Sequence, residues 1–173
     1  FSSGLQDIKT EIDKDEIRIS FFPYCSEVIN ADDAHKKLFF RDQLNHATVA
    51  LNKKVEQKLD LSAGELESIT ALACCYENNL GCKQSSTNKE KALFWYSMAE
   101  QFGDKLGTLY TGLVYYLGLL GANKNNELAL KQFKKVENDF DLSKILIENI
   151  LLSRGAENKK NSNNARPVTI KKV

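Results

Sequence analysis

The stretch KALFWYSMAEQFGD, from Lys91 to Asp104, decides how the rest of the chain is interpreted. It contains the only tryptophan and the only methionine of the protein. Its apolar residues recur at helical spacing, and the pattern stops at Gly103. These features predict a helix over residues 89–102 with Asn88 as its N-cap.

The segments on both sides also have the character of helices. The chain holds only two prolines, and apolar residues at helical spacing predict further helices over 32–59, 62–80, 105–119, 125–138 and 142–155. Ser62 with Glu65 three residues later forms a capping-box pattern. Residues 105–120 are apolar nearly all round, so this helix must be covered on two sides. The predicted fold class is therefore all-α.

Three regions are expected along the chain. Residues 1–60 form a non-repeat arm and helix, 61–156 hold about two repeats and a capping helix, and 157–173 form a flexible polar tail. Within the arm, Glu16–Phe22 alternates like a short strand. No partner strand is evident nearby, so this segment is expected to lie as an extended arm on the helices.

Two consecutive helix pairs align with each other, which indicates an internal repeat. Corresponding positions in the first helices are Ala73 with Gly112, Tyr76 with Tyr115 and Asn79 with Gly118; in the second helices they are Ala92 with Ala129 and Tyr96 with Phe133. The offset is constant within each helix and changes only in the loop CKQSSTN. The small residue allows close helix approach, the tyrosine fills the gap, and Asn or Gly ends the helix.

The opening stretch resembles the KAxxWYxKAAxxGD signature of Sel-one-like repeats, which are related to tetratricopeptide repeats. The matching residues are Lys91, Ala92, Trp95, Tyr96, Ala99, Gly103 and Asp104, whereas Met98 and Glu100 depart from the pattern. The resemblance covers about Leu66 to Val136. It implies a short right-handed α-solenoid that acts as an interaction scaffold, and it makes Trp95 a packing residue instead of a ligand-stacking one.

The four cysteines suggest an oxidising compartment. Cys74 and Cys75 are adjacent on a predicted helix and point about 100° apart, so they need different partners. We expect Cys25 to bond to one of them, pinning the N-terminal arm to the first repeat, and Cys82 to bond to the other. This implies a periplasmic or secreted protein whose signal peptide has been removed. The alternative is a cytoplasmic protein with four reduced thiols.

Several function classes lack support in the sequence. The net charge of +1 gives no drive toward nucleic acid, and no apolar run reaches the length for membrane insertion. His35 and His46 share a helix face but lie about 16 Å apart, too far to share a metal. No nucleophile–base pair or phosphate-binding motif is evident, so no catalytic residue, metal or cofactor is expected.

The expected function is therefore protein binding. The partner would meet an exposed face of the repeats, with Tyr110, Tyr116 and Glu77 as the candidate contact residues. One specific form is an immunity protein that neutralises a secreted toxin, and an alternative is an envelope or secretory-pathway adaptor or structural subunit. An enzyme with a site in the N-terminal region is the other class of hypothesis. No oligomeric state is implied.

Overall fold

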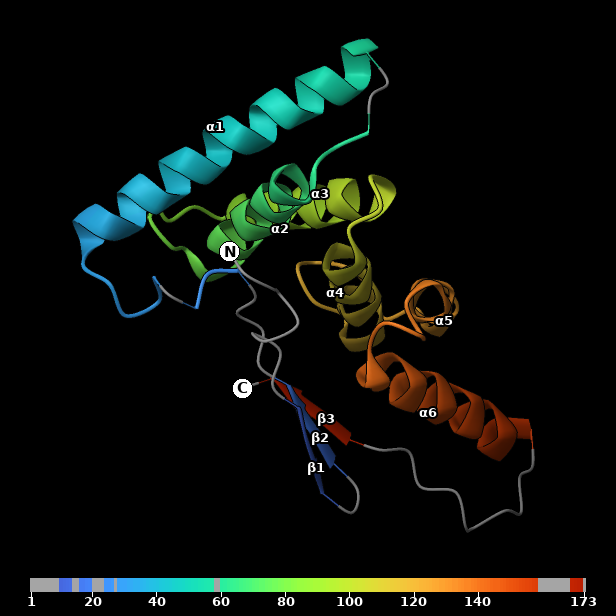
Figure 1. Ribbon diagram of the computed structural model, residues 1–173. Helices are drawn as coiled ribbons and strands as arrows, with labels where there is room; N and C mark the ends of the chain where they lie inside the picture. Colours follow the sequence, from blue (N-terminus) through green and yellow to red (C-terminus); the bar gives the residue numbers. More distant parts are fainter. Residues whose placement is uncertain are drawn as a thin grey trace.

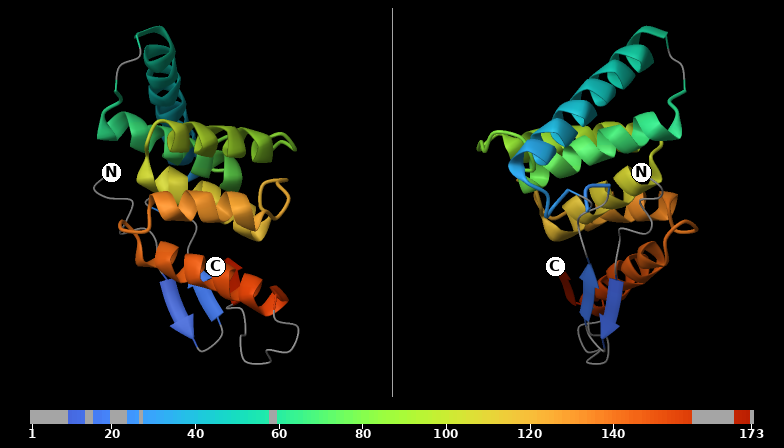
Figure 2. Two further views of the ribbon diagram at one scale, coloured as in Figure 1. Left: turned by 90° about the vertical axis from the view of Figure 1, so that its right-hand side faces the viewer. Right: turned by 60° about the vertical axis from the view of Figure 1, so that its left-hand side comes forward.

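The structure, a computed structural model, describes residues 10–13, 16–19, 24–26, 28–57, 60–158 and 169–172. Most of these residues are helical, which confirms the all-α class. The helices are α1 (Asp33–Gln57), α2 (Ala63–Asn78), α3 (Asn88–Gln101), α4 (Lys105–Leu117), α5 (Asn126–Lys135) and α6 (Asp141–Asn158). Each helix packs against the next in the chain, so the row runs in sequence order from α1 to α6 (Figures 1 and 2).

A small sheet joins segments from opposite ends of the chain. Its strands are β1 (Thr10–Asp13), β2 (Glu16–Ile19) and β3 (Thr169–Lys172), in the order β1-β2-β3. β2 pairs antiparallel with β1 and parallel with β3. A strand is thus present over Glu16–Ile19 and is paired with other strands, while residues 20–22 of the expected strand lie outside the described part of the chain. The tail, expected to be flexible, contributes β3; residues 159–168 and 173 lie outside the described part of the chain.

Side-chain caps mark the starts of α2 and α5. The Ser62 hydroxyl accepts from the Glu65 backbone N–H at 3.2 Å, and the Glu65 carboxylate accepts from the Ser62 N–H at 3.0 Å. This confirms the predicted capping box. Lys53 of α1 donates to the same Glu65 carboxylate at 3.1 Å, which ties α1 to the start of α2. Asn125 caps α5 by accepting from the Leu128 N–H.

Asp104, the last residue of the opening stretch, is the N-cap of α4. Its Oδ2 accepts from the Gly107 backbone N–H at 2.9 Å and from the Thr70 hydroxyl of α2 at 2.5 Å. Burial raises the pKa of the Asp104 carboxyl, while these two hydrogen bonds oppose the rise. One buried side chain therefore both starts α4 and holds it against α2.

The positions that aligned in the sequence occupy corresponding places in the two helix pairs. Asn79 and Gly118 end α2 and α4 in the left-handed conformation, with φ of 53° and 68°. The remaining aligned side chains in α2 to α5 are buried or half-buried: Ala73, Tyr76, Ala92, Tyr96, Gly112, Tyr115, Ala129 and Phe133. Trp95 is also buried, with its ring edge against Phe94. The α2–α3 and α4–α5 pairs thus share the burial of their aligned residues and the left-handed conformation at the end of their first helices.

Gly112 allows α5 to approach α4 closely. A Cβ atom built at this position would lie 2.6 Å from Cε1 of Phe133, much closer than van der Waals contact permits. Because Phe133 is fully buried in the main core, it has little room to move away. The small residue required by the repeat pattern therefore has a specific packing role.

We predict opposite effects for two glycine substitutions within helices. Gly112→Ala should lower the free energy of unfolding by about 1–3 kcal/mol, because its methyl group overpacks the Phe133 ring. Gly155→Ala in α6, where a Cβ would meet nothing within 4 Å, should raise it by about 0.5–1 kcal/mol through helix propensity. Urea denaturation of both variants checks this. Equal effects would contradict the close-approach role of Gly112.

Candidate binding groove between α1 and the α2–α3 loop

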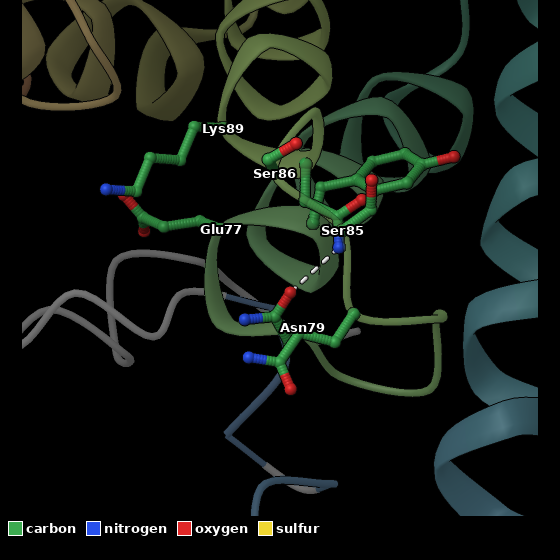
Figure 3. A pocket seen from close by; sticks show the side chains of 8 residues that line it. Glu77, Asn79, Ser85, Ser86 and Lys89 are labelled. Atoms are coloured by element: carbon green, nitrogen blue, oxygen red, sulfur yellow. Dashed lines mark hydrogen bonds between the residues drawn. The ribbon is translucent and has the colours of Figure 1, made fainter.

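Two pockets lie beside the α2–α3 loop, the second of them against α1, and Asn79 lines both. The first, of about 360 Å³, is lined by Tyr76, Glu77, Asn79, Gln84, Ser85, Ser86, Asn88 and Lys89. The second, of about 460 Å³, is lined by Asp33, Lys36, Lys37, Asn79, Gly81, Cys82 and Lys83. Figure 3 shows the first pocket, with Lys89 and Glu77 at the left, Ser85 and Ser86 to their right and Asn79 below. We call the two together the polar groove.

Asn79 and Asn88 form the floor of the polar groove. Asn79 adopts a left-handed conformation that asparagine tolerates better than most residues. Its Oδ1 accepts from Nδ2 of Asn88 at 2.8 Å, and the same Nδ2 donates to the Lys83 carbonyl at 3.0 Å. Asn88 was predicted to cap α3, but the N-cap is Thr87 and Asn88 is the first helical residue. The side-chain amide of Asn88 instead holds the α2–α3 loop through its hydrogen bond to the Lys83 carbonyl.

Gly81 sets the distance between this loop and α1. Its φ is +73°, and a Cβ at this position would lie 2.0 Å from the Lys36 carbonyl oxygen. Only a glycine can therefore sit directly on the α1 backbone here. The contact brings Lys36 and Lys37 of α1 beside Lys83 of the loop, around the second pocket.

Positive charge exceeds negative charge in the polar groove. Four lysines line it, Lys36, Lys37, Lys83 and Lys89, against the two carboxylates of Asp33 and Glu77. Lys37, Lys83 and Lys89 are exposed, and Lys36 is half-buried. The amide and hydroxyl groups of Asn79, Ser85 and Ser86 add neutral hydrogen-bonding capacity. The groove therefore suits an anionic ligand that also presents hydrogen-bonding groups.

Of the predicted contact residues, Glu77 lies in this groove. It is half-buried, and it accepts a hydrogen bond from the Tyr96 hydroxyl at 3.4 Å. Burial raises the pKa of Tyr96 well above its usual range, and the Glu77 carboxylate raises it further. Tyr96 therefore stays protonated and acts as a donor to Glu77 throughout the physiological range.

The other two predicted contact residues lie elsewhere and belong largely to the core. Tyr110 is only 1% exposed and stacks on Tyr96, with ring centroids 5.4 Å apart. Tyr116 is half-buried against Phe133, and its hydroxyl accepts from Nδ2 of Asn149. The expectation that Tyr110 is exposed is wrong, because α4 is buried nearly all round from Leu106 to Val114.

The cysteines confirm part of the disulfide prediction. Cys25 and Cys74 form a disulfide, and both are fully buried, so the N-terminal arm is linked to α2. The second expected bond is absent, since Cys75 and Cys82 are free thiols. The Cys82 thiol instead donates to the Cys75 carbonyl at 3.7 Å. A buried disulfide is consistent with an oxidising compartment.

Sequence reasoning missed the lysines and the asparagine floor of the polar groove. Lys36 and Lys37 stand near the start of α1, far in sequence from Lys83 and Lys89. The one local signal was the glycine at position 81, which marks a turn but does not say what lies against it. Only the packing of the loop on α1 brings these charges together.

A pair of loop substitutions should measure the contact that shapes the groove. We expect Gly81→Ala to lower the free energy of unfolding by about 2–4 kcal/mol, since it adds a backbone clash to the cost of positive φ. Gly103→Ala has a similar φ, +90°, but its Cβ would meet nothing within 4 Å, so about 1 kcal/mol is expected. Thermal and urea denaturation give the difference. Similar losses for both variants would show that the contact with Lys36 is unimportant.

The cysteine pairing predicts a specific thiol count. The denatured, unreduced protein should contain two free thiols, and reduction should expose four. Reduction should also destabilise the fold by about 2–4 kcal/mol, because the Cys25–Cys74 bond closes a long loop. In the native state at pH 8, iodoacetamide should label Cys82 before Cys75. Burial raises the pKa of the Cys75 thiol to about 12, which leaves very little reactive thiolate. Mass spectrometry of the alkylated peptides checks both statements.

Within the described part of the chain, no three His, Cys, Asp or Glu side chains gather as metal ligands. None of the described helices is long and apolar enough to cross a membrane. The chain matches no protein-family model, and comparisons with curated proteins and with solved structures give no match either.

Proposed function

We propose that this protein is a non-catalytic protein-binding module of the Sel-one-like, α-solenoid kind, working in the periplasm or outside the cell. The observation that carries the proposal is the correspondence between the α2–α3 and α4–α5 pairs in burial and in the ends of their first helices. Stacked pairs of this kind form a rigid, extended framework whose surface suits recognition of another macromolecule. The polar groove at the end of the first pair supplies a surface on which a partner can dock.

The N-terminal segment supports a partner surface at the loops. In many helical repeats a partner lies on the first helices of the pairs. Here the central part of α2, from Ser68 to Cys75, is buried all round. Cys25 is linked to it, and Val28 and Ile29 pack on the same cluster. The chain itself thus covers part of this helix, whereas the polar groove at the loop end lies outside the covered part and is open to a partner.

Export is the second part of the proposal, and the buried Cys25–Cys74 disulfide supports it. Because an exported module meets other exported proteins, the partner in this proposal is an exported protein. The specific form we propose is an immunity protein bound to a secreted toxin. The identity of the captured protein distinguishes this form from an envelope adaptor.

Affinity capture from the native host tests the function. The full, oxidised chain is immobilised and exposed to the exported protein fraction, and retained proteins are identified and then titrated as purified components. We expect one partner that forms a complex of fixed stoichiometry, with a dissociation constant of micromolar or tighter. The matched control is the same chain reduced and alkylated. If no exported protein forms a saturable complex with the oxidised chain, the binding function is refuted.

A further inference from the structure

The four lysines of the polar groove are not among the lysines that form ion pairs within the described residues. Ion pairs within the described residues engage several lysines elsewhere: Lys53 with Glu65, Lys54 with Asp60, Lys105 with Asp139, and Lys135 with Glu100. Over the same residues, the four lysines of the groove form no ion pair. Among the described residues, no carboxylate is therefore paired with any of these four ammonium groups.

This concentration of charge is built into the fold. The Gly81 contact with the Lys36 carbonyl fixes the loop on α1, and the Asn88 amide fixes the Lys83 carbonyl. The groove thus gathers four ammonium groups against two carboxylates, and this excess of positive charge favours an anionic ligand.

The shape of the groove favours an elongated ligand. The two pockets, of about 360 and 460 Å³, have Asn79 in common, and lysines line both. A single small ion would occupy one pocket only. A peptide in extended conformation can place carboxylates near Lys36, Lys37 and Lys83 in one pocket. Its backbone can meet the polar groups of Asn79, Ser85 and Ser86 in the other.

Resting on the function proposed above, we propose that the polar groove binds an acidic, extended segment of the partner protein. Carboxylates of that segment pair with the ammonium groups of Lys36, Lys37, Lys83 and Lys89. Single-stranded nucleic acid is the competing polyanion. It relies on aromatic stacking platforms, and Tyr76 is the one aromatic side chain lining the two pockets. The groove therefore fits an acidic peptide better.

Charge reversal in the full chain tests this assignment. The probe is fluorescein-labelled decaglutamate, and binding is followed by fluorescence anisotropy. We expect Lys36→Glu with Lys83→Glu to weaken binding by about tenfold or more. The matched control, Lys131→Glu with Lys134→Glu on the exposed face of α5, makes the same change in net charge outside the groove and should alter binding less than about twofold. Equal effects of the two pairs would overturn the proposal.

A second pair of variants and a nucleic-acid probe test the two alternative explanations, a folding defect and binding of nucleic acid. If Lys36→Glu disturbs folding, as circular dichroism would show, Lys37→Gln with Lys89→Gln replaces two exposed side chains and should still weaken binding by about threefold. Labelled decathymidylate provides the nucleic-acid arm. Tighter binding of decathymidylate than of decaglutamate, lost on charge reversal, would overturn the peptide assignment.

The captured native partner separates the two proposals. If a partner binds the wild-type chain and the Lys36→Glu, Lys83→Glu variant equally well, the groove assignment fails while the binding function stands. If no partner is captured although decaglutamate binds in the groove, the proposed function fails instead.

Discussion

The carboxylate of Asp104 is the constraint on which the helical row depends. It accepts from Gly107 at the start of α4 and from Thr70 in the middle of α2, so it couples two helices that are separated by the whole of α3. Leaving it unpaired in the interior would cost several kcal/mol, which makes both donors necessary once the site is buried. Given this junction, α3 must fold back beside α2, and the next pair continues the row from a defined point.

The parts of the fold that rest on local chemistry could be predicted from the sequence. Ser62 and Glu65 reveal a helix start by themselves, and Asn79 and Gly118 reveal helix ends, because each acts within a few residues. The pairing of β2 with β3 could not be predicted in this way. Alternation identified the strand, but its parallel partner lies near the other end of the chain. No spacing rule connects segments that meet only through the folding of everything between them.

Less of the candidate site could be predicted from the sequence, because it too depends on segments that meet only in the folded chain. Cys74 and Cys75 are neighbours, and only the position of the N-terminal arm selects Cys74 for the bond. Tyr110 has the side chain of a contact residue, yet the neighbouring helices bury it. The charge of the groove depends on a glycine meeting a carbonyl of α1. These are facts of packing between elements, whereas a sequence pattern reports mostly on one element at a time.

The three-stranded sheet distinguishes this row of helices from an open helical stack. In an open stack, each unit touches only its neighbours, so the outermost helix can fray while the remainder stays intact. Here β3 follows the final helix and pairs with β2, which precedes the first one. Backbone hydrogen bonds between β2 and β3 thereby join the segments before the first helix and after the last one. Opening of this one strand pair would release both ends of the chain from each other at once.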